Sequence, residues 1–138
     1  MNCQPFELHH IGILVPDIAK AVESYSSRFG YRVNGERVHD PVQTAHIQLM
    51  SLADSSPQVE LVAPDGPRSK LANALKKGAG LNHLCYLTSD IEEDCRRLRE
   101  GGMLLLHAPV PAKAFSNRRI AWLMGRDGIP VELLEYEL

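Results

Sequence analysis

Residues 8–15 have the sequence LHHIGILV, which places most of its aliphatic residues on one face when it is read as a strand. Successive side chains of a strand point to opposite faces, so Ile11, Ile13 and Val15 share one face. This aliphatic face is typical of a strand that packs on a core. His10 lies on the other face and therefore points away from that core.

A helical pattern follows this strand. Asp17 is a residue type that caps helices, and Gly30 predicts the end of the helix. Between them, apolar residues recur at the spacing of one helix face: Ile18, Val22, Tyr25 and Phe29. Strands are predicted next over 31–38, 44–50 and 58–63, so the first half has the order β-α-β-β-β.

The second half repeats this order. A strand over 81–88 precedes a helix that Ser89 or Asp90 caps, and the later strands are predicted over 103–107, 119–124 and 129–136. A short amphipathic segment, 71–76, and a glycine-rich loop join the halves. The pattern predicts an α+β fold of two βαβββ modules, about 6–64 and about 80–138, within a single domain of residues 1–138.

The two halves are most similar around one histidine and one glutamate each. The sequence LHHIGILVPDI at 8–18 resembles LNHLCYLTSDI at 81–91, and VELV at 59–62 resembles VELL at 131–134. Nearly the same spacing separates His10 from His83 and Glu60 from Glu132. Solenoid repeats are shorter, about 20–50 residues, so the spacing indicates two copies of one module.

These four side chains suggest a metal site. Two imidazoles and two carboxylates are a common ligand set for a divalent ion. Alternation turns each glutamate away from its apolar neighbours, and burying an unpaired carboxylate is costly. Each residue alone would more often be structural, but their duplication favours a shared site. We therefore predict that one divalent ion (Co²⁺, Ni²⁺, Mn²⁺ or Zn²⁺) binds to His10, Glu60, His83 and Glu132.

Composition narrows the classes of function. The 138 residues are 44% hydrophobic and 23% charged with a net charge of −2, which is typical of a soluble globular domain and argues against nucleic-acid binding. Without a long apolar run or signal-peptide pattern, we expect a cytoplasmic protein with no membrane partner. The cysteines lack CxxC spacing, so we expect neither a disulfide framework nor a thiolate zinc site, and Cys85 should be a buried hydrophobic residue.

Four segments of the chain resemble the vicinal oxygen chelate superfamily, which includes glyoxalase I, methylmalonyl-CoA epimerase and extradiol dioxygenases. They are HIGI at 10–13, VELVAP at 59–64, NHLCY at 82–86 and GIPVEL at 128–133, and they are most similar to the methylmalonyl-CoA epimerase-like branch. The resemblance implies that the paired modules form an incomplete barrel around a metal, with His10, Glu60, His83 and Glu132 at the ligand positions. It also implies an isomerase or lyase that acts through a metal-stabilised enolate, with Glu132 as catalytic base.

One departure leaves the reaction open. Epimerases similar to this chain carry an acidic residue before a Gln-Gly-Val segment, where this chain has DPVQTAHI at 40–47. Either Asp40 reaches the site, or His46 or Gln48 substitutes, or the reaction differs. The alternatives are a glyoxalase I-like lactoylglutathione lyase, which has the same ligand order, and a non-catalytic protein that sequesters antibiotics or other ligands. The fourth ligand, Glu60, argues against extradiol cleavage.

Residues expected to contact a substrate lie on the later strands of each module: His46, Gln48, Arg118, Arg119 and Trp122. The two arginines could meet the carboxylate or phosphates of a small acyl thioester, which is the predicted partner. Alternatively, these arginines protect an exposed strand edge, and Trp122 is expected in a pocket wall or core. Uncovered sheet edges also predict a homodimer with two-fold symmetry.

Overall fold

The computed structural model describes residues 5–54 and 56–137. The chain divides into two compact units. The first, called here the N-terminal unit, is His10–Asn82, and the C-terminal unit is His83–Leu138 together with Met1–His9. Each unit therefore contains one copy of the sequence repeat.

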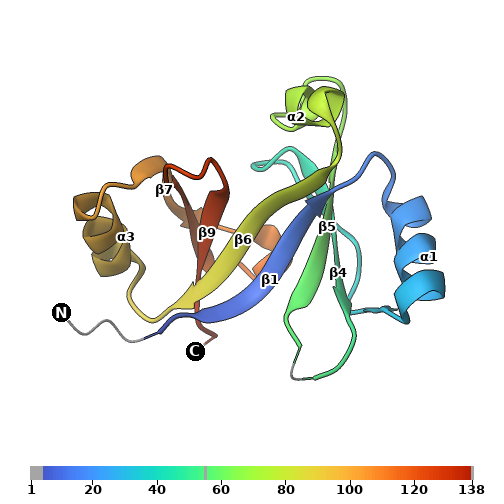
Figure 1. Cartoon of the computed structure of the whole chain (residues 1–138), viewed down its shortest axis with the longest axis horizontal. Coiled ribbons are helices and arrows are strands. Elements are labelled where there is room, and N and C mark those ends of the chain that lie inside the picture. Colours follow the sequence, from blue (N-terminus) through green and yellow to red (C-terminus); the bar gives the residue numbers. More distant parts are fainter. Residues whose placement is uncertain (1–4, 55, 138) are drawn as a thin grey trace. The chain divides into compact units, whose positions relative to one another are not determined.

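The N-terminal unit contains a mixed sheet and a helix on one of its faces (Figure 1). β1 pairs in parallel with β5, β5 pairs antiparallel with β4, and β4 pairs antiparallel with both β2 and β3. The elements are β1 (Glu7–Leu14), α1 (Ile18–Phe29), β2 (Arg32–Val33), β3 (Val38–Asp40), β4 (Ala45–Ser51), β5 (Gln58–Pro64) and α2 (Ala72–Lys77).

The core of this unit lies between α1 and the sheet. Ile13 and Val15 pack there with aliphatic residues of β4 and β5, which confirms the apolar face predicted for the first strand. The helix boundaries are also confirmed: the Asp17 carboxylate accepts a hydrogen bond from the backbone N–H of Lys20 at 3.1 Å, and Gly30 adopts a left-handed conformation with φ 79°.

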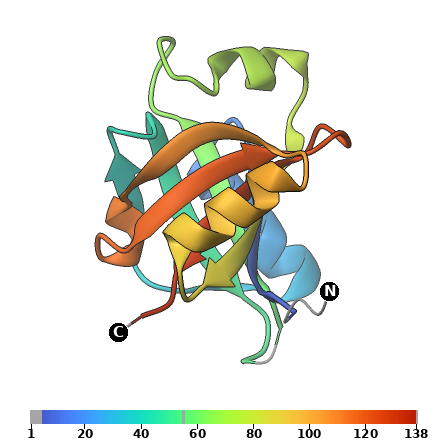
Figure 2. The same cartoon turned by 90° about the vertical axis from the view of Figure 1, so that its left-hand side faces the viewer.

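The C-terminal unit repeats this arrangement. β6 pairs in parallel with β9, and β8 pairs antiparallel with both β9 and β7. Figure 2 shows α3 (gold) in front of the strands of this unit. Asp90, one of the two predicted caps, accepts the hydrogen bond at the start of α3. The elements are β6 (Gly80–Thr88), α3 (Ile91–Glu100), β7 (Leu104–Pro111), the 3-10 helix Lys113–Phe115, β8 (Arg119–Met124) and β9 (Pro130–Glu135).

The α+β class and the modular order are as predicted, and within the described residues neither unit's sheet closes into a barrel. Two predicted strands differ in extent. The strand expected over 31–38 is interrupted, because Gly35 adopts φ 81° and turns the chain between β2 and β3. β7 is longer than expected and its pairing with β8 shifts register twice.

Two expectations from composition can be compared with the structure. Cys85 is 0% exposed, as predicted, and Cys95 is 6% exposed. Cys3 lies outside the described residues. Over 5–54 and 56–137, the helices lack the length and apolar character that crossing a membrane requires.

Candidate metal centre

His10 and Glu60 form a buried pair in the N-terminal unit. In the parallel pairing of β1 with β5, Gly12 lies opposite Glu60, and His10 shares the face of Gly12 because strand side chains alternate. His10 Nε2 lies 3.4 Å from Glu60 Oε2, and the two side chains are 0% and 4% exposed. The pair occupies the face of the sheet opposite to α1.

His83 and Glu132 form the equivalent pair in the C-terminal unit. Cys85 lies opposite Glu132 in the parallel pairing of β6 with β9, so the register repeats that of Gly12 and Glu60. His83 Nε2 lies 3.5 Å from Glu132 Oε1, and the side chains are 2% and 4% exposed. The repeat in the sequence is therefore also a repeat in local geometry.

The distances within the pairs suit metal ligands. A charge-assisted hydrogen bond from an N–H group to a carboxylate is about 2.7–2.9 Å long. The nitrogen–oxygen distance in each pair is longer than this. Two donor atoms about 2.1 Å from one zinc-sized ion lie about 3.4 Å apart at a tetrahedral angle. Imidazole nitrogen and carboxylate oxygen both bind divalent ions. His10 with Glu60, and His83 with Glu132, are therefore two pairs of buried side chains that could each supply ligands to a metal ion.

Trp122 extends the C-terminal half of this set. It lies directly opposite Glu132 in the antiparallel pairing of β8 with β9, so both side chains share one face. The indole packs edge to face on the His83 ring, with centroids 4.8 Å apart and planes at 83°. The sequence predicts a pocket wall or core position for Trp122, and the structure packs its ring beside a candidate ligand.

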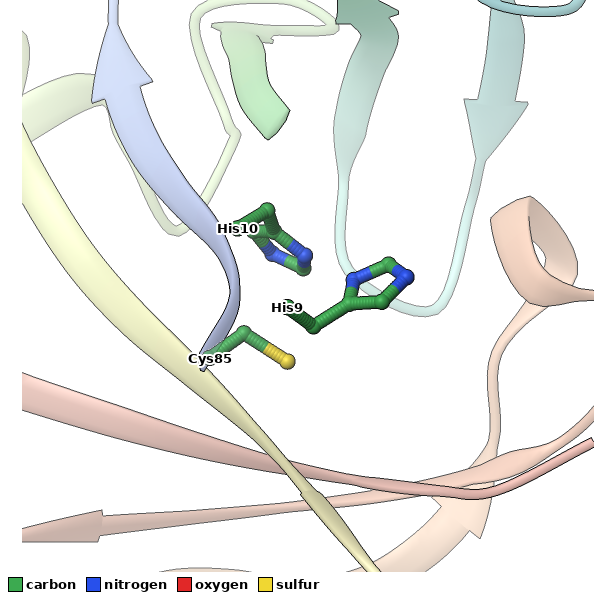
Figure 3. Close-up of side chains that lie close together, drawn as sticks. All are labelled: His9, His10 and Cys85. Carbon is green, nitrogen blue, oxygen red and sulfur yellow. The ribbon is translucent and has the colours of Figure 1, made fainter. Parts of the chain in front are cut away.

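Cys85 is a neighbour that the sequence interpretation treated only as a core residue. Figure 3 shows the Cys85 and His9 side chains close together, beside His10 on β1. Cys85 occupies the register position that Gly12 occupies in the other unit. Aligning the two repeats would have indicated a side chain on the Glu132 face here.

His46 and Gln48 do not join the Glu60 pair, which corrects the expectation that they line the same site. Leu49 lies opposite Glu60 in the pairing of β4 with β5, so positions 46 and 48 face the other side of the sheet. Gln48 Nε2 donates to two backbone carbonyls, at 3.1 and 3.0 Å. The His46 ring lies 4.9 Å from that of His39.

Asp40 is the third residue that could replace the acidic residue of the similar epimerases, and it does lie on the Glu60 face. It pairs with Ala45 on β4, which shares that face by alternation. Asp40 is 2% exposed, and its Oδ1 accepts hydrogen bonds from the backbone N–H groups of Val42 and Gln43, at 3.0 and 3.2 Å. Of the three candidates, only Asp40 is on the face of the proposed ligands.

Arg119 braces the C-terminal unit, which corrects the expectation that it contacts substrate, whereas substrate contact by Arg118 stays a prediction. Arg119 forms an ion pair with Glu135 at 2.9 Å and another with Glu92 on α3. Trp122 shares the face of Glu132, and a residue three positions away along β8 points to the opposite face. Arg119 therefore lies on the α3 side of the sheet. These hydrogen bonds raise the pKa of the Arg119 guanidinium and lower the pKa of the Glu135 carboxyl. Arg118 donates to two backbone carbonyls, at 3.2 and 3.0 Å.

We expect Glu135→Gln to lower the urea midpoint of unfolding at about pH 7 and to change it less at about pH 3. The hydrogen bond from Arg119 lowers the folded pKa of Glu135 below its ordinary 4.5. The pair therefore stabilises the fold above that value, and the contribution is lost as pH falls through the folded pKa. Partial exposure keeps the effect small. Equal destabilisation at both pH values, measured by circular dichroism, would contradict this assignment.

Comparisons with known proteins extend over nearly the whole chain. The model of the Glyoxalase/Bleomycin resistance protein/Dioxygenase superfamily matches residues 9–135. A mitochondrial methylmalonyl-CoA epimerase of Dictyostelium discoideum is 26% identical over 135 residues, 94% of this chain and 78% of that protein.

Two solved structures share the fold. Methylmalonyl-CoA epimerase from Mycobacterium tuberculosis has a TM-score of 0.83 and 31% identity, and the match covers 95% of this chain and 88% of that one. A variant of the Streptomyces coelicolor enzyme in complex with 2-nitronate-propionyl-CoA has a TM-score of 0.83 and 25% identity, over 95% and 97% of the two chains. The family match and these structures agree with the resemblance seen in the sequence. This chain therefore belongs to the glyoxalase/bleomycin resistance protein/dioxygenase superfamily and has the vicinal oxygen chelate fold.

Proposed function

We propose that this protein is a metal-dependent epimerase of an anionic acyl thioester of the methylmalonyl-CoA class. The observation that carries the proposal is the buried His/Glu pair repeated in both units, at 3.4 and 3.5 Å. The substrate class is supported by the related methylmalonyl-CoA epimerases, one of which is in complex with 2-nitronate-propionyl-CoA.

In this proposal, His10, Glu60, His83 and Glu132 hold one divalent ion. When bound, the ion would supply a Lewis acid that stabilises negative charge on a substrate oxygen. The imidazoles would contribute nitrogen ligands. The two buried carboxylates contribute negative charge, which is costly to bury unless a positive charge balances it.

Glu132 is the proposed proton acceptor. Its carboxylate is 4% exposed and faces His83. Glu132 would take the proton from the carbon between the thioester and the carboxylate. Inverting that carbon requires a proton to be delivered on its other side, and Asp40 is the candidate donor because it lies on the ligand face.

Asp40→Asn should reduce the rate of epimerisation by about 100-fold, the usual size of an acid–base contribution. Asparagine keeps the Oδ1 acceptor for the backbone N–H groups of Val42 and Gln43, so the turn should be preserved. We expect metal content and thermal stability to stay near those of the wild type. His46→Ala, on the opposite face, is the matched control. An unchanged rate of epimerisation in Asp40→Asn would exclude Asp40 as the proton donor.

The overall proposal is tested by solvent exchange. Metal-loaded protein in D₂O should incorporate deuterium into methylmalonyl-CoA at the carbon between its two carbonyl groups, and protein treated with a chelator should not. Parallel incubation with the hemithioacetal of glutathione and methylglyoxal tests the glyoxalase alternative. If neither compound reacts and the purified protein holds a stoichiometric organic ligand, the proposal fails and a binding protein is the better explanation.

A further inference from the structure

Trp122 carries a polar group that the proposed mechanism does not use. Its indole Nε1 is buried and has no hydrogen-bond partner among the residues that the structure describes. An indole nitrogen can only donate, so its hydrogen bond requires an acceptor. Buried donors without partners are uncommon in folded proteins, and each one calls for an explanation.

The polar side chains opposite Trp122 on the neighbouring strands do not accept a hydrogen bond from its N–H group. Glu132, directly opposite on β9, has its carboxylate 3.5 Å from His83. His107, opposite on β7, is exposed and places its Nδ1 2.7 Å from the backbone oxygen of Ala108. The edge-to-face contact with His83 accounts for an aromatic ring at position 122, but it gives the indole N–H group no acceptor.

We infer that the Trp122 N–H donates a hydrogen bond to the free carboxylate of the bound acyl thioester, and so selects substrates that carry one. The inference rests on the proposed function. It follows from the position of the indole ring, which packs on His83 and lies opposite Glu132, on the face where the reacting carbon would lie. A hydrogen bond to a carboxylate is stronger than one to a neutral carbonyl, so the donor favours an anionic substrate over its uncharged counterpart.

The chain contains a single tryptophan, so the wild-type protein reports on this donor directly. Uniform ¹⁵N labelling should give one indole N–H resonance in zinc-loaded protein. We expect 2-nitronate-propionyl-CoA, whose nitronate oxygens replace the carboxylate oxygens, to shift the indole proton downfield. Propionyl-CoA, which lacks both groups, should produce no such shift. This measurement needs no variant and so does not depend on how Trp122→Phe folds.

Trp122→Phe removes the N–H and keeps an aromatic ring against His83. Its Kd for 2-nitronate-propionyl-CoA, measured by calorimetry, should rise about ten-fold, the effect of one lost hydrogen bond. Its Kd for propionyl-CoA and its zinc content should stay within about two-fold, since the ring contact is retained. Tyr86→Phe, which removes a polar aromatic group packed on the α3 side, is the control and should change neither Kd.

Three outcomes decide the matter. A downfield indole shift with a selective loss of nitronate binding supports the inference. Wild-type binding without that shift, or equal affinity in Trp122→Phe, overturns the role of Trp122 and leaves the proposed function intact. If wild-type protein binds neither compound, the proposed function fails and this inference fails with it.

Discussion

Replacing His83 with alanine is expected to remove the metal ion almost completely. His83 Nε2 is buried and lies 3.5 Å from Glu132, so the substitution deletes one donor and leaves a buried carboxylate without its neighbour. Losing a direct ligand should weaken affinity by more than the about 10–100-fold typical of an outer-shell change. After dialysis, atomic emission should find less than about one tenth of the wild-type metal per chain.

The repeat supplies the controls for this experiment. His10→Ala should lose metal to the same extent, because His10 has the equivalent position in the N-terminal unit. His46→Ala removes a histidine from the same unit on the opposite face and should keep wild-type metal content. Unchanged metal in His83→Ala would contradict the ligand set. Metal loss in His83→Ala but not in His10→Ala would restrict the site to the C-terminal unit.

The elements that the sequence predicted well depend on interactions over a few residues. Asp17 and Gly30 end α1 through contacts with the first and last turns of that helix, and such contacts can be read from local sequence. The prediction of one strand over 31–38 is wrong, because Gly35 adopts a left-handed conformation and not an extended one. A glycine permits both conformations, so composition alone does not distinguish them.

The faces of the strands were harder to predict than the strands themselves. In β1, the aliphatic residues Ile13 and Val15 pack on α1, so the alternation of side chains correctly predicted that His10 lies on the opposite face. For β4 the same argument fails, because both faces are buried and the polar one, with Gln48, is on the α1 side. Only the pairing of β4 with β5, a contact between distant residues, shows that Gln48 points away from Glu60.

The arginines show a related limit. Positive charge at positions 118 and 119 suggested an anionic substrate, but charge does not identify its partner. Arg119 instead pairs with Glu92 on α3 and Glu135 on β9, distant in sequence and brought together by folding. The His/Glu pairs are different, because duplication supplies a second, independent copy of the same spacing. That repetition allowed the two His/Glu pairs to be predicted from one sequence.

Glu132→Gln is expected to abolish exchange of the substrate α-proton more completely than it abolishes metal binding. Glutamine has nearly the same size and keeps an oxygen beside His83, but its amide cannot accept the proton. We expect the exchange rate to fall by about 1,000-fold or more, within the range of general acid–base contributions. Metal content, measured on the same sample, should fall much less. Deuterium incorporation into methylmalonyl-CoA gives the rate.

Glu60→Gln is the matched comparison, since Glu60 holds the equivalent position in the other unit and is assigned as a ligand alone. Both substitutions remove one negative charge from the same ligand set, so their effects on metal affinity should be similar. At equal metal occupancy, a larger loss of exchange in Glu132→Gln therefore reports proton transfer by Glu132. Equal loss in the two variants would show that Glu132 acts only as a ligand, and the base would have to be sought elsewhere on this face, with Asp40 the first candidate.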